Sequence, residues 1–343
     1  MKTLAAILIE QKKPLELAEV EVPAPGFGQV LVEVRASRIC GSQIGEIDGA
    51  KGPDKWLPHL LGHEGCGIVR EVGPEVTRVK VGDKVCLHWR PGNGIESRAP
   101  QYRWDSRTVN AGFITTFNHL AVISENRLTT VPTDLDDEVV CLLADTLTTG
   151  FGVITNEAKV RFGEAVVVIG CGGIGLGVIQ GAKLAGAFPV IGVDVHEHKL
   201  RVAEKFGATH TVNSKEKNFS AAVREILKRD PEVVIDGTGN PDVVAQAYEL
   251  TAKKGRTVLF GVMRSENALR MNTLPLHFGK SITGSEGGAS RPHEDIPRYL
   301  RMMQAGMFDP KPMVSHRGKL EDVNALIGKM RSGEVVHAVM HYN

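Results

Sequence analysis

The sequence has little of several features that mark particular classes of protein. Only 5% of its 343 residues are aromatic, and 41 basic side chains are balanced by 40 acidic ones. A net charge of +1 argues against binding to nucleic acid or another polyanion, which needs a surplus of lysine and arginine. With 42% hydrophobic residues, the composition is that of a globular chain, and disordered and fibrous classes are excluded.

Cysteine and long apolar runs are scarce as well. The cysteines form no C-x-x-C pair, and an odd number cannot all be paired: Cys40, Cys66, Cys86, Cys141 and Cys171. A chain this long can bury a core without disulfides, which predicts reduced thiols and a cytoplasmic location. The apolar run Leu4–Ile9 is too short for a signal peptide, and none approaches the ~20 residues of a membrane span.

The length predicts two domains, and the pattern of predicted strands and helices differs between them. Residues 1–147 are β-rich: apolar and polar positions alternate in Val30–Val34, and further strands are predicted at Ile68–Val72 and Lys80–Val85. The polar stretch Gly92–Gly112 predicts a long irregular loop.

In residues 148–284, strands and helices alternate. The apolar run Ala165–Ile169 predicts a buried parallel strand, and a helix follows from Gly173. Asn218 is a predicted N-cap for a helix running through Lys228. This alternation of strands and helices predicts an α/β fold with a doubly wound Rossmann sheet. Residues 285–343, with two amphipathic helices and a last strand, are predicted to return to the first domain.

A dinucleotide-binding motif opens the helix after the first buried strand. Residues 170–175, Gly-Cys-Gly-Gly-Ile-Gly, match G-x-G-x-x-G, and Asp194 ends the next predicted strand. The glycines permit a tight turn, a close backbone approach to the pyrophosphate and close helix packing, and the helix N-terminus attracts phosphate. The Asp194 carboxylate should bind ribose hydroxyls and repel a 2′-phosphate, which favours NAD over NADP. The alternative is a glycine-rich turn with a capping aspartate.

Cys40, His63, Glu64 and Asp145 are candidate metal ligands. Thiolate, imidazole and carboxylate all bind zinc, and a catalytic zinc has three protein ligands and one open position. The residue types alone do not select these positions, because a lone cysteine or histidine is more often part of a packed core.

The segment from Gly62 to Val76, G-H-E-x-x-G-x5-G-x2-V, resembles the zinc signature of the medium-chain alcohol dehydrogenase superfamily. The resemblance covers nearly the whole chain, including G-D-K-V at Gly82–Val85 and T-T-G at Thr148–Gly150. The chain is most similar to the polyol and secondary-alcohol branch, which includes sorbitol and threonine dehydrogenases. The resemblance implies a β-rich GroES-like catalytic domain, a Rossmann domain, and hydride transfer between a small alcohol of polyol, sugar or cyclitol type and NAD.

The resemblance also implies a role for particular residues. Cys40, His63 and Asp145 would hold one catalytic zinc, Glu64 would lie close enough to exchange onto it, and Ser42 would accept the hydroxyl proton. Trp89 would line the substrate pocket. The residues expected at the cofactor are Thr149, Gly170, Gly172, Gly173, Ile174, Gly175, Asp194, Lys199, Val262 and His337. The alternatives are a local turn hydroxyl for Ser42 and core packing for Trp89.

One segment and three single positions depart from the pattern of that superfamily. Residues 87–140 contain no cysteine, so the four-cysteine structural zinc site of some relatives cannot exist and only one zinc is expected. Gln43 stands where an aspartate is usual, Gly45 where a proton-relay histidine often lies, and His337 where an arginine often contacts the cofactor.

The segment His88–Arg107 is compatible with more than one class of substrate. It carries Arg90, Arg98, Arg103 and Arg107, with aromatic residues between them. Such a segment either forms a basic rim for a polar substrate or merely replaces the structural-zinc lobe.

Two other readings of the whole chain remain beside the zinc dehydrogenase: a zinc-free enal or quinone reductase, and a non-catalytic NAD-binding protein. The superfamily resemblance implies a homodimer or homotetramer. The balanced charge and the lack of a long apolar run predict no nucleic-acid or membrane partner.

Overall fold

The computed structural model describes residues 1–342 and divides the chain into two compact units. The β-rich unit comprises Met1–Asp145 and the C-terminal segment from Arg291, and the α/β unit comprises Thr146–Ser290. The sequence-based boundaries fall after residues 147 and 284. All five cysteines are buried and unpaired within these described residues.

The β-rich unit contains a closed barrel with the strand order β1-β2-β7-β8-β4. Its strands are β1 (Lys2–Leu8), β2 (Glu16–Glu21), β4 (His59–Leu60), β7 (Gln101–Trp104) and β8 (Arg107–Asn110). The prediction of a long irregular loop over Gly92–Gly112 is therefore wrong for its second half, because β7 and β8 form an antiparallel hairpin there, whereas residues 92–100 contain no helix or strand. The cross-strand partners Tyr102 and Val109 are fully buried, and the backbone N–H of Val122 donates to the Tyr102 hydroxyl at 2.8 Å.

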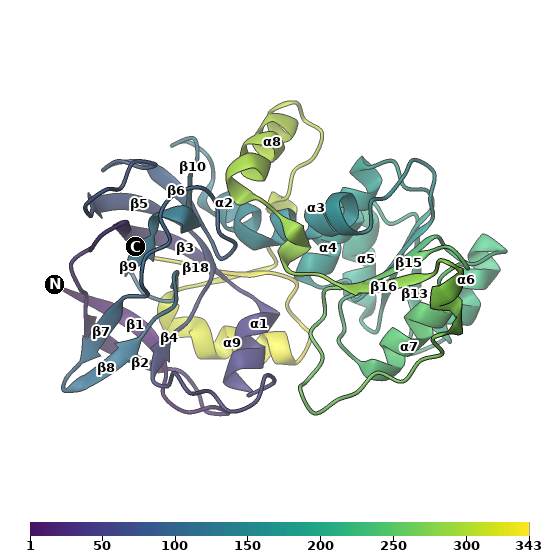
Figure 1. The fold of residues 1–343 in the computed structure, drawn as a ribbon, viewed down its shortest axis with the longest axis horizontal. Helices are drawn as coiled ribbons and strands as arrows, with labels where there is room; N and C mark the ends of the chain where they lie inside the picture. Colours follow the sequence, from purple (N-terminus) through teal and green to yellow (C-terminus); the bar gives the residue numbers. More distant parts are fainter. Residues whose placement is uncertain (343) are drawn as a thin grey trace. The chain divides into compact units, whose positions relative to one another are not determined.

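A second sheet in this unit has the strand order β10-β6-β5-β3-β18-β17, and β9 also pairs with β3. Its strands are β3 (Gln29–Ile39), β5 (Glu64–Val72), β6 (Lys84–His88), β9 (Leu120–Ser124), β10 (Leu128–Thr130), β17 (His316–Gly318) and β18 (Ala338–His341). The helices of the unit are α1 (Gly41–Ile47), α2 (Asp137–Leu142), α8 (Pro292–Gln304) and α9 (Val323–Arg331). Because β18 pairs antiparallel with β3, the end of the chain is built into the sheet that carries Cys40 (Figure 1).

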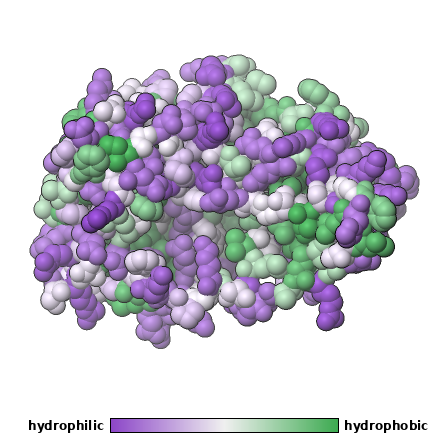
Figure 2. All heavy atoms as spheres, in the orientation of Figure 1, coloured by the Kyte–Doolittle hydropathy of each residue, from purple (hydrophilic) through white to green (hydrophobic). Residues whose placement is uncertain are grey.

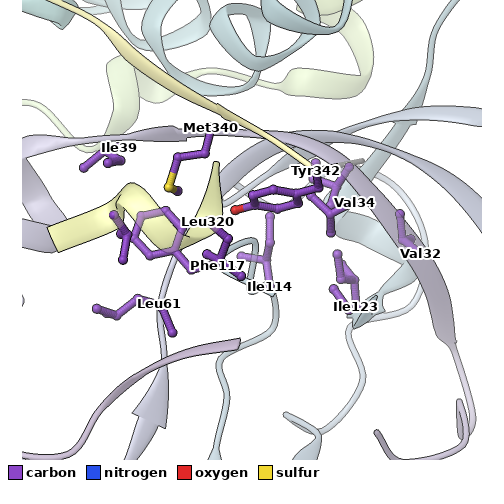
Figure 3. Close-up of a cluster of buried hydrophobic side chains, with 14 of the residues drawn as sticks. Val32, Val34, Ile39, Leu61, Ile114, Phe117, Ile123, Leu320, Met340 and Tyr342 are labelled. Atoms are coloured by element: carbon purple, nitrogen blue, oxygen red, sulfur yellow. The ribbon is translucent and has the colours of Figure 1, made fainter. Parts of the chain in front are cut away.

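The core of the β-rich unit joins side chains from both ends of the chain. Figure 3 shows Leu320, Met340 and Tyr342 among apolar side chains that come from the N-terminal strands and loops, including Phe117. The Tyr342 hydroxyl donates a hydrogen bond to the Thr116 carbonyl at 2.7 Å, so this buried polar group is satisfied. The shared core fixes the strands that carry the candidate metal ligands.

The α/β unit is a parallel sheet with the strand order β13-β12-β11-β14-β15-β16, which is the order of a Rossmann sheet. Its strands are β11 (Val166–Ile169), β12 (Val190–Asp194), β13 (His210–Asn213), β14 (Val233–Asp236), β15 (Arg256–Leu259) and β16 (Ser281–Gly284). Its helices are α3 (Thr148–Gly152), α4 (Gly173–Leu184), α5 (Glu197–Phe206), α6 (Phe219–Leu227) and α7 (Pro241–Leu250). Helices α4 and α5 lie on one face and α6 and α7 on the other (Figure 1).

Both the fold class and one predicted helix start are confirmed. The β-rich GroES-like domain and the doubly wound Rossmann domain are present, as predicted. Asn218 caps α6 as expected, since its side-chain oxygen accepts from the Ala221 N–H at 2.9 Å.

A long apolar helical run connects the two units. Asp137–Glu157 is long and apolar enough to cross a membrane, but 94% of its apolar 18-residue window is buried inside the protein, as in the core helix of a globular fold. Two stretches of it, Leu143–Leu147 and Val153–Glu157, are π-helical. Asp145 lies in the first, and such irregular turns often occur at functional sites because they redirect a side chain.

Candidate active site

The β-rich unit brings four candidate metal ligands together. Cys40 caps the N-terminus of α1 directly after β3, His63 precedes β5, Glu64 begins β5, and Asp145 lies in the π-helical turn. One donor atom from each lies within 4.8 Å of all the others. His63 Nε2 is 3.6 Å from Asp145 Oδ2, which in turn is 3.9 Å from the Cys40 sulfur.

The chemistry of this cluster fits a zinc ion. Within residues 1–342, no hydrogen-bond partner reaches the buried Nε2 of His63, although carboxylate oxygens surround it. Burial lowers the pKa of His63, but Asp145 and Cys40 more than offset this and leave it well above its usual value. The cluster therefore favours a positive charge, and its sulfur, nitrogen and oxygen donors are the set that zinc prefers.

Two side chains orient these candidate ligands. The Gln43 side-chain oxygen accepts from the Cys40 N–H at 2.7 Å, and its amide nitrogen lies against Nδ1 of His63. Trp89 donates its indole N–H to Asp145 Oδ1 at 2.9 Å, which leaves Oδ2 directed at His63. Trp89 also packs against the hydrophobic core of the unit. Contacts of this kind fix the geometry of a metal ligand.

Glu64 has a partner that sequence reasoning missed. The guanidinium of Arg38 donates from Nη1 to both carboxylate oxygens of Glu64, at 2.6 and 2.8 Å, and both side chains are buried. Burial raises the pKa of Glu64 to about 7, although Arg38 acts in the opposite direction. The available signal was an arginine in the apolar end of a strand, two residues before Cys40, where a charge needs a partner.

Ser42 lies at the exposed side of this cluster. It is the second residue of α1, it is exposed to solvent, and its hydroxyl is 3.5 Å from Nδ1 of His63. Gly45, which replaces the usual relay histidine, lies one turn further along the same helix.

The four arginines predicted as a basic rim belong to different structures. Arg90 stacks over the Trp89 ring at 5.6 Å. Arg103 and Arg107 lie on the β7–β8 hairpin. Arg103 is opposite Glu21 of β2 in the register of the barrel, and Arg107 stacks on Trp104. Only Arg90 adjoins a residue that contacts the metal-ligand cluster.

The glycine-rich turn of the α/β unit has the geometry that a dinucleotide requires. Gly170 has φ +95°, a left-handed conformation that favours glycine, and a Cβ on Gly175 would lie 1.9 Å from the Gly170 oxygen. A Cβ on Gly172 would meet no atom of residues 1–342 within 4 Å, so open space lies beside the N-terminus of α4. Such a space could hold a pyrophosphate, because the first N–H groups of a helix have no partner within the helix and favour an anion.

Asp194 lies beside a cavity of about 340 Å³ in this unit. Its Oδ2 accepts from the Cys171 N–H at 2.8 Å and its Oδ1 from the His196 N–H at 2.9 Å, so it braces the turn. The cavity is also lined by residues that sequence reasoning missed, which follow the carboxyl ends of β13 and β14: Ser214, Lys217, Asn218, Phe219, Thr238, Val243 and Gln246.

The other predicted cofactor residues are not part of this cavity. Among the residues described, its lining includes Gly170 and Asp194 but none of the other predicted cofactor residues of this unit, which are Thr149, Gly172, Gly173, Ile174, Gly175, Lys199 and Val262. Thr149 is buried in α3, Lys199 lies in the first turn of α5, and Val262 is exposed after β15. His337 belongs to the β-rich unit, where it precedes β18.

A Rossmann sheet and a zinc-type ligand cluster in one chain define a metal-dependent dehydrogenase, and comparisons with known proteins agree. The profile for the alcohol dehydrogenase GroES-like domain matches residues 26–133, and that for the zinc-binding dehydrogenase matches residues 173–305. S-(hydroxymethyl)glutathione dehydrogenase from Paracoccus denitrificans is 33% identical, with 100% of both chains covered.

Two solved structures are similar over the whole chain. An alcohol dehydrogenase zinc-binding domain protein from Burkholderia ambifaria has a TM-score of 0.91 at 26% identity, covering 100% of this chain and 99% of the other. Benzyl alcohol dehydrogenase from Acinetobacter calcoaceticus has a TM-score of 0.90 at 26% identity, with 100% of both chains covered.

The chain belongs to the zinc-binding alcohol dehydrogenase family. This membership confirms the predicted superfamily and supports an oxidoreductase that uses zinc and NAD on an alcohol. None of the three names is that of a polyol dehydrogenase, so the polyol branch stays a prediction.

Proposed function

We propose that this protein oxidises a secondary alcohol of polyol, sugar or cyclitol type with NAD, at one catalytic zinc held by Cys40, His63 and Asp145. The observation that carries this proposal is the convergence of their donor atoms, together with Glu64, within 4.8 Å. A zinc ion held there would supply Lewis acidity, which lowers the pKa of a bound hydroxyl.

The residues around the cluster have distinct tasks in this proposal. Gln43 and Trp89 hold the metal ligands in place through the contacts described above. Ser42 accepts the substrate hydroxyl proton. Because Ser42 is exposed, it can pass that proton directly to water, and a histidine at position 45 is not needed.

The α/β unit binds the NAD in this proposal. The N-terminus of α4 would take the pyrophosphate, with Gly172 leaving the space for it, and Asp194 would accept from the adenosine ribose. Each Asp194 oxygen accepts one backbone N–H and has a second lone pair for a ribose hydroxyl. Its negative charge disfavours the 2′-phosphate of NADP.

The polar surroundings of the cluster support a hydroxyl-rich substrate. The hydroxyl of Ser42 is exposed, and the positively charged Arg90 stacks over Trp89, whose indole contacts Asp145. A second candidate substrate is S-(hydroxymethyl)glutathione, which the name of the 33% identical relative favours.

We also propose a homodimer or homotetramer formed through the edge of the Rossmann sheet. Strand β16 is one of the two edge strands of this sheet, and exposed apolar side chains lie before it: Val262, Leu274, Leu276 and Phe278. Figure 2 shows hydrophobic residues gathered over the part of the surface that carries β16 and α7. An exposed edge with apolar neighbours is suited to pairing with a second copy. A concentration-independent monomer by light scattering would contradict this assembly.

The substrate proposal is tested by measuring NADH formation with matched alcohols. The panel would contain free and phosphorylated polyols, S-(hydroxymethyl)glutathione, benzyl alcohol and short aliphatic alcohols, each with wild-type protein and with Arg90→Ala. We expect the highest kcat/KM with a polyol and a loss in Arg90→Ala. Equal turnover of short aliphatic alcohols, with no effect of Arg90→Ala, would contradict the polyol proposal. A preference for the glutathione adduct would select the second candidate.

A further inference from the structure

The metal-ligand cluster holds one more donor than a catalytic zinc site uses. Four protein ligands make a closed, structural type of site, whereas three leave a position for substrate. The donor atoms of Cys40, His63, Glu64 and Asp145 all lie within 4.8 Å of one another, so distance alone does not keep Glu64 out of the coordination shell. Something else must decide between three ligands and four.

Arg38 forms a buried ion pair with the carboxylate of Glu64. Its Nη1 contacts both Glu64 oxygens, at 2.6 and 2.8 Å, and the two side chains are 3% and 0% exposed. Arg38 is part of β3, two residues before Cys40, and β3 is paired on both sides by β5 and β18. The guanidinium is therefore held by the same rigid strand that presents the cysteine ligand.

The energetics favour this pairing over metal binding by Glu64. If the carboxylate turned to the metal, the buried Arg38 guanidinium would lose both of its hydrogen bonds to Glu64, its directly contacting counter-charge. Removing one partner from a buried ion pair is strongly unfavourable, because the other charge is left uncompensated in a low-dielectric site.

We propose that Arg38 is a positioning residue that withholds Glu64 from the metal, so that Cys40, His63 and Asp145 bind it and one coordination position stays open. This inference rests on the proposed metal centre and adds the determinant of its coordination number. It also means that Glu64 exchanges onto the metal only when it leaves Arg38.

Cobalt(II) substituted for zinc provides a readout that does not depend on catalysis. Its visible d–d bands report coordination number, and imidazole added to the solution shifts them only where a position is open. In the wild type we expect an absorption band from Cys40 thiolate to cobalt and a clear shift with imidazole. In Arg38→Met we expect Glu64 to become the fourth ligand, and imidazole to bind about tenfold more weakly or not at all.

Two further variants make the test decisive. The double variant Arg38→Met/Glu64→Gln should regain imidazole binding, which a general loss of structure would not allow. Glu64→Gln alone should keep the wild-type cobalt spectrum and imidazole affinity if it folds, and it tests separately whether Glu64 lies outside the coordination shell.

The inference is overturned if Arg38→Met binds imidazole as the wild type does, or if Glu64→Gln alone changes the d–d bands. A wild-type cobalt protein without the thiolate band would instead contradict the proposed metal centre itself.

Discussion

The two candidate sites of this protein are built in opposite ways. The dinucleotide turn is six consecutive residues, 170–175, between β11 and α4, and Asp194 at the end of the neighbouring strand completes it. The metal-ligand cluster is drawn from three distant parts of the chain, with Cys40 and Asp145 separated by 105 positions. A local motif needs only one turn to form, whereas the cluster needs the sheet, the core and the π-helical turn to be in place.

The largest effect that separates the two sites is expected from Asp145→Asn. An amide is a poor zinc ligand, and the loss of one negative charge weakens the binding of the metal. The kcat/KM should therefore fall by about three orders of magnitude. NADH binding, measured by fluorescence, should remain within about twofold because the residues proposed to bind the pyrophosphate and the adenosine ribose lie in the α/β unit, away from Asp145 in sequence and in a separate compact unit. Activity within tenfold of the wild type would show that Asp145 is not a ligand.

Acid should weaken the β-rich unit through His88. This buried imidazole donates from Nδ1 to the Arg90 carbonyl at 2.8 Å and accepts from the Thr129 hydroxyl at 2.9 Å, and burial lowers its pKa to about 4. An unfolded histidine takes up a proton near pH 6.5, so stability falls as the pH drops from about 6.5 to 4. The expected loss between pH 7 and 4.5 is on the order of 2–3 kcal/mol.

Tryptophan fluorescence during urea unfolding measures this loss, because Trp56, Trp89 and Trp104 all belong to the β-rich unit. His88→Asn removes the titrating group. The free energy of unfolding of this variant should therefore fall less between pH 7 and 4.5 than that of the wild type, by on the order of 2–3 kcal/mol. An equal decline in the wild type and in His88→Asn would rule out His88 as the cause.

Trp89→Phe tests how far the metal cluster depends on neighbouring residues. Phenylalanine keeps the aromatic packing but removes the N–H that holds Asp145 Oδ1, so zinc affinity should fall by about 10–100-fold. Trp104→Phe is the matched control, because that indole lies on the β7–β8 hairpin. Equal zinc affinities in both variants, measured by competition with a chelator, would refute the role of the indole.

The smallest effect is expected at the contiguous site. Asp194→Gly removes the carboxylate expected to bind the ribose, which should weaken NAD by about 1–2 kcal/mol, roughly tenfold, and relax the preference over NADP. Asp194→Asn keeps an acceptor for one of the two backbone N–H groups, of Cys171 and His196, and serves as a partial control for the turn. Kinetics in which the unmodified protein uses NADP as well as NAD would contradict the assignment.

The same contrast explains what could be predicted from the sequence. The Rossmann strands and the capping of α6 by Asn218 follow from local periodicity and local hydrogen bonds. The order of the glycines at 170–175 is similarly local. Ser214 and Thr238, which line the cavity beside Asp194, come from separate βα turns and become neighbours only through the strand order.

The metal-ligand cluster in the β-rich unit could not be predicted from local sequence patterns alone. Its candidate ligands came from a family resemblance, because no spacing relates Cys40, His63 and Asp145. The pairing of Arg38 with Glu64 depends on the register of β3 against β5, which one sequence does not reveal. The β7–β8 hairpin was missed because only Tyr102 and Val109 mark its buried face among polar residues.

The measurement that tests the central claim most directly is the zinc content of the purified protein, determined with that of Cys40→Ser and His63→Ala. The account predicts about one zinc per chain in the wild type, and little or none in either variant. Two tightly bound zinc ions in the wild type, or one that persists when Cys40 and His63 are replaced, would contradict it.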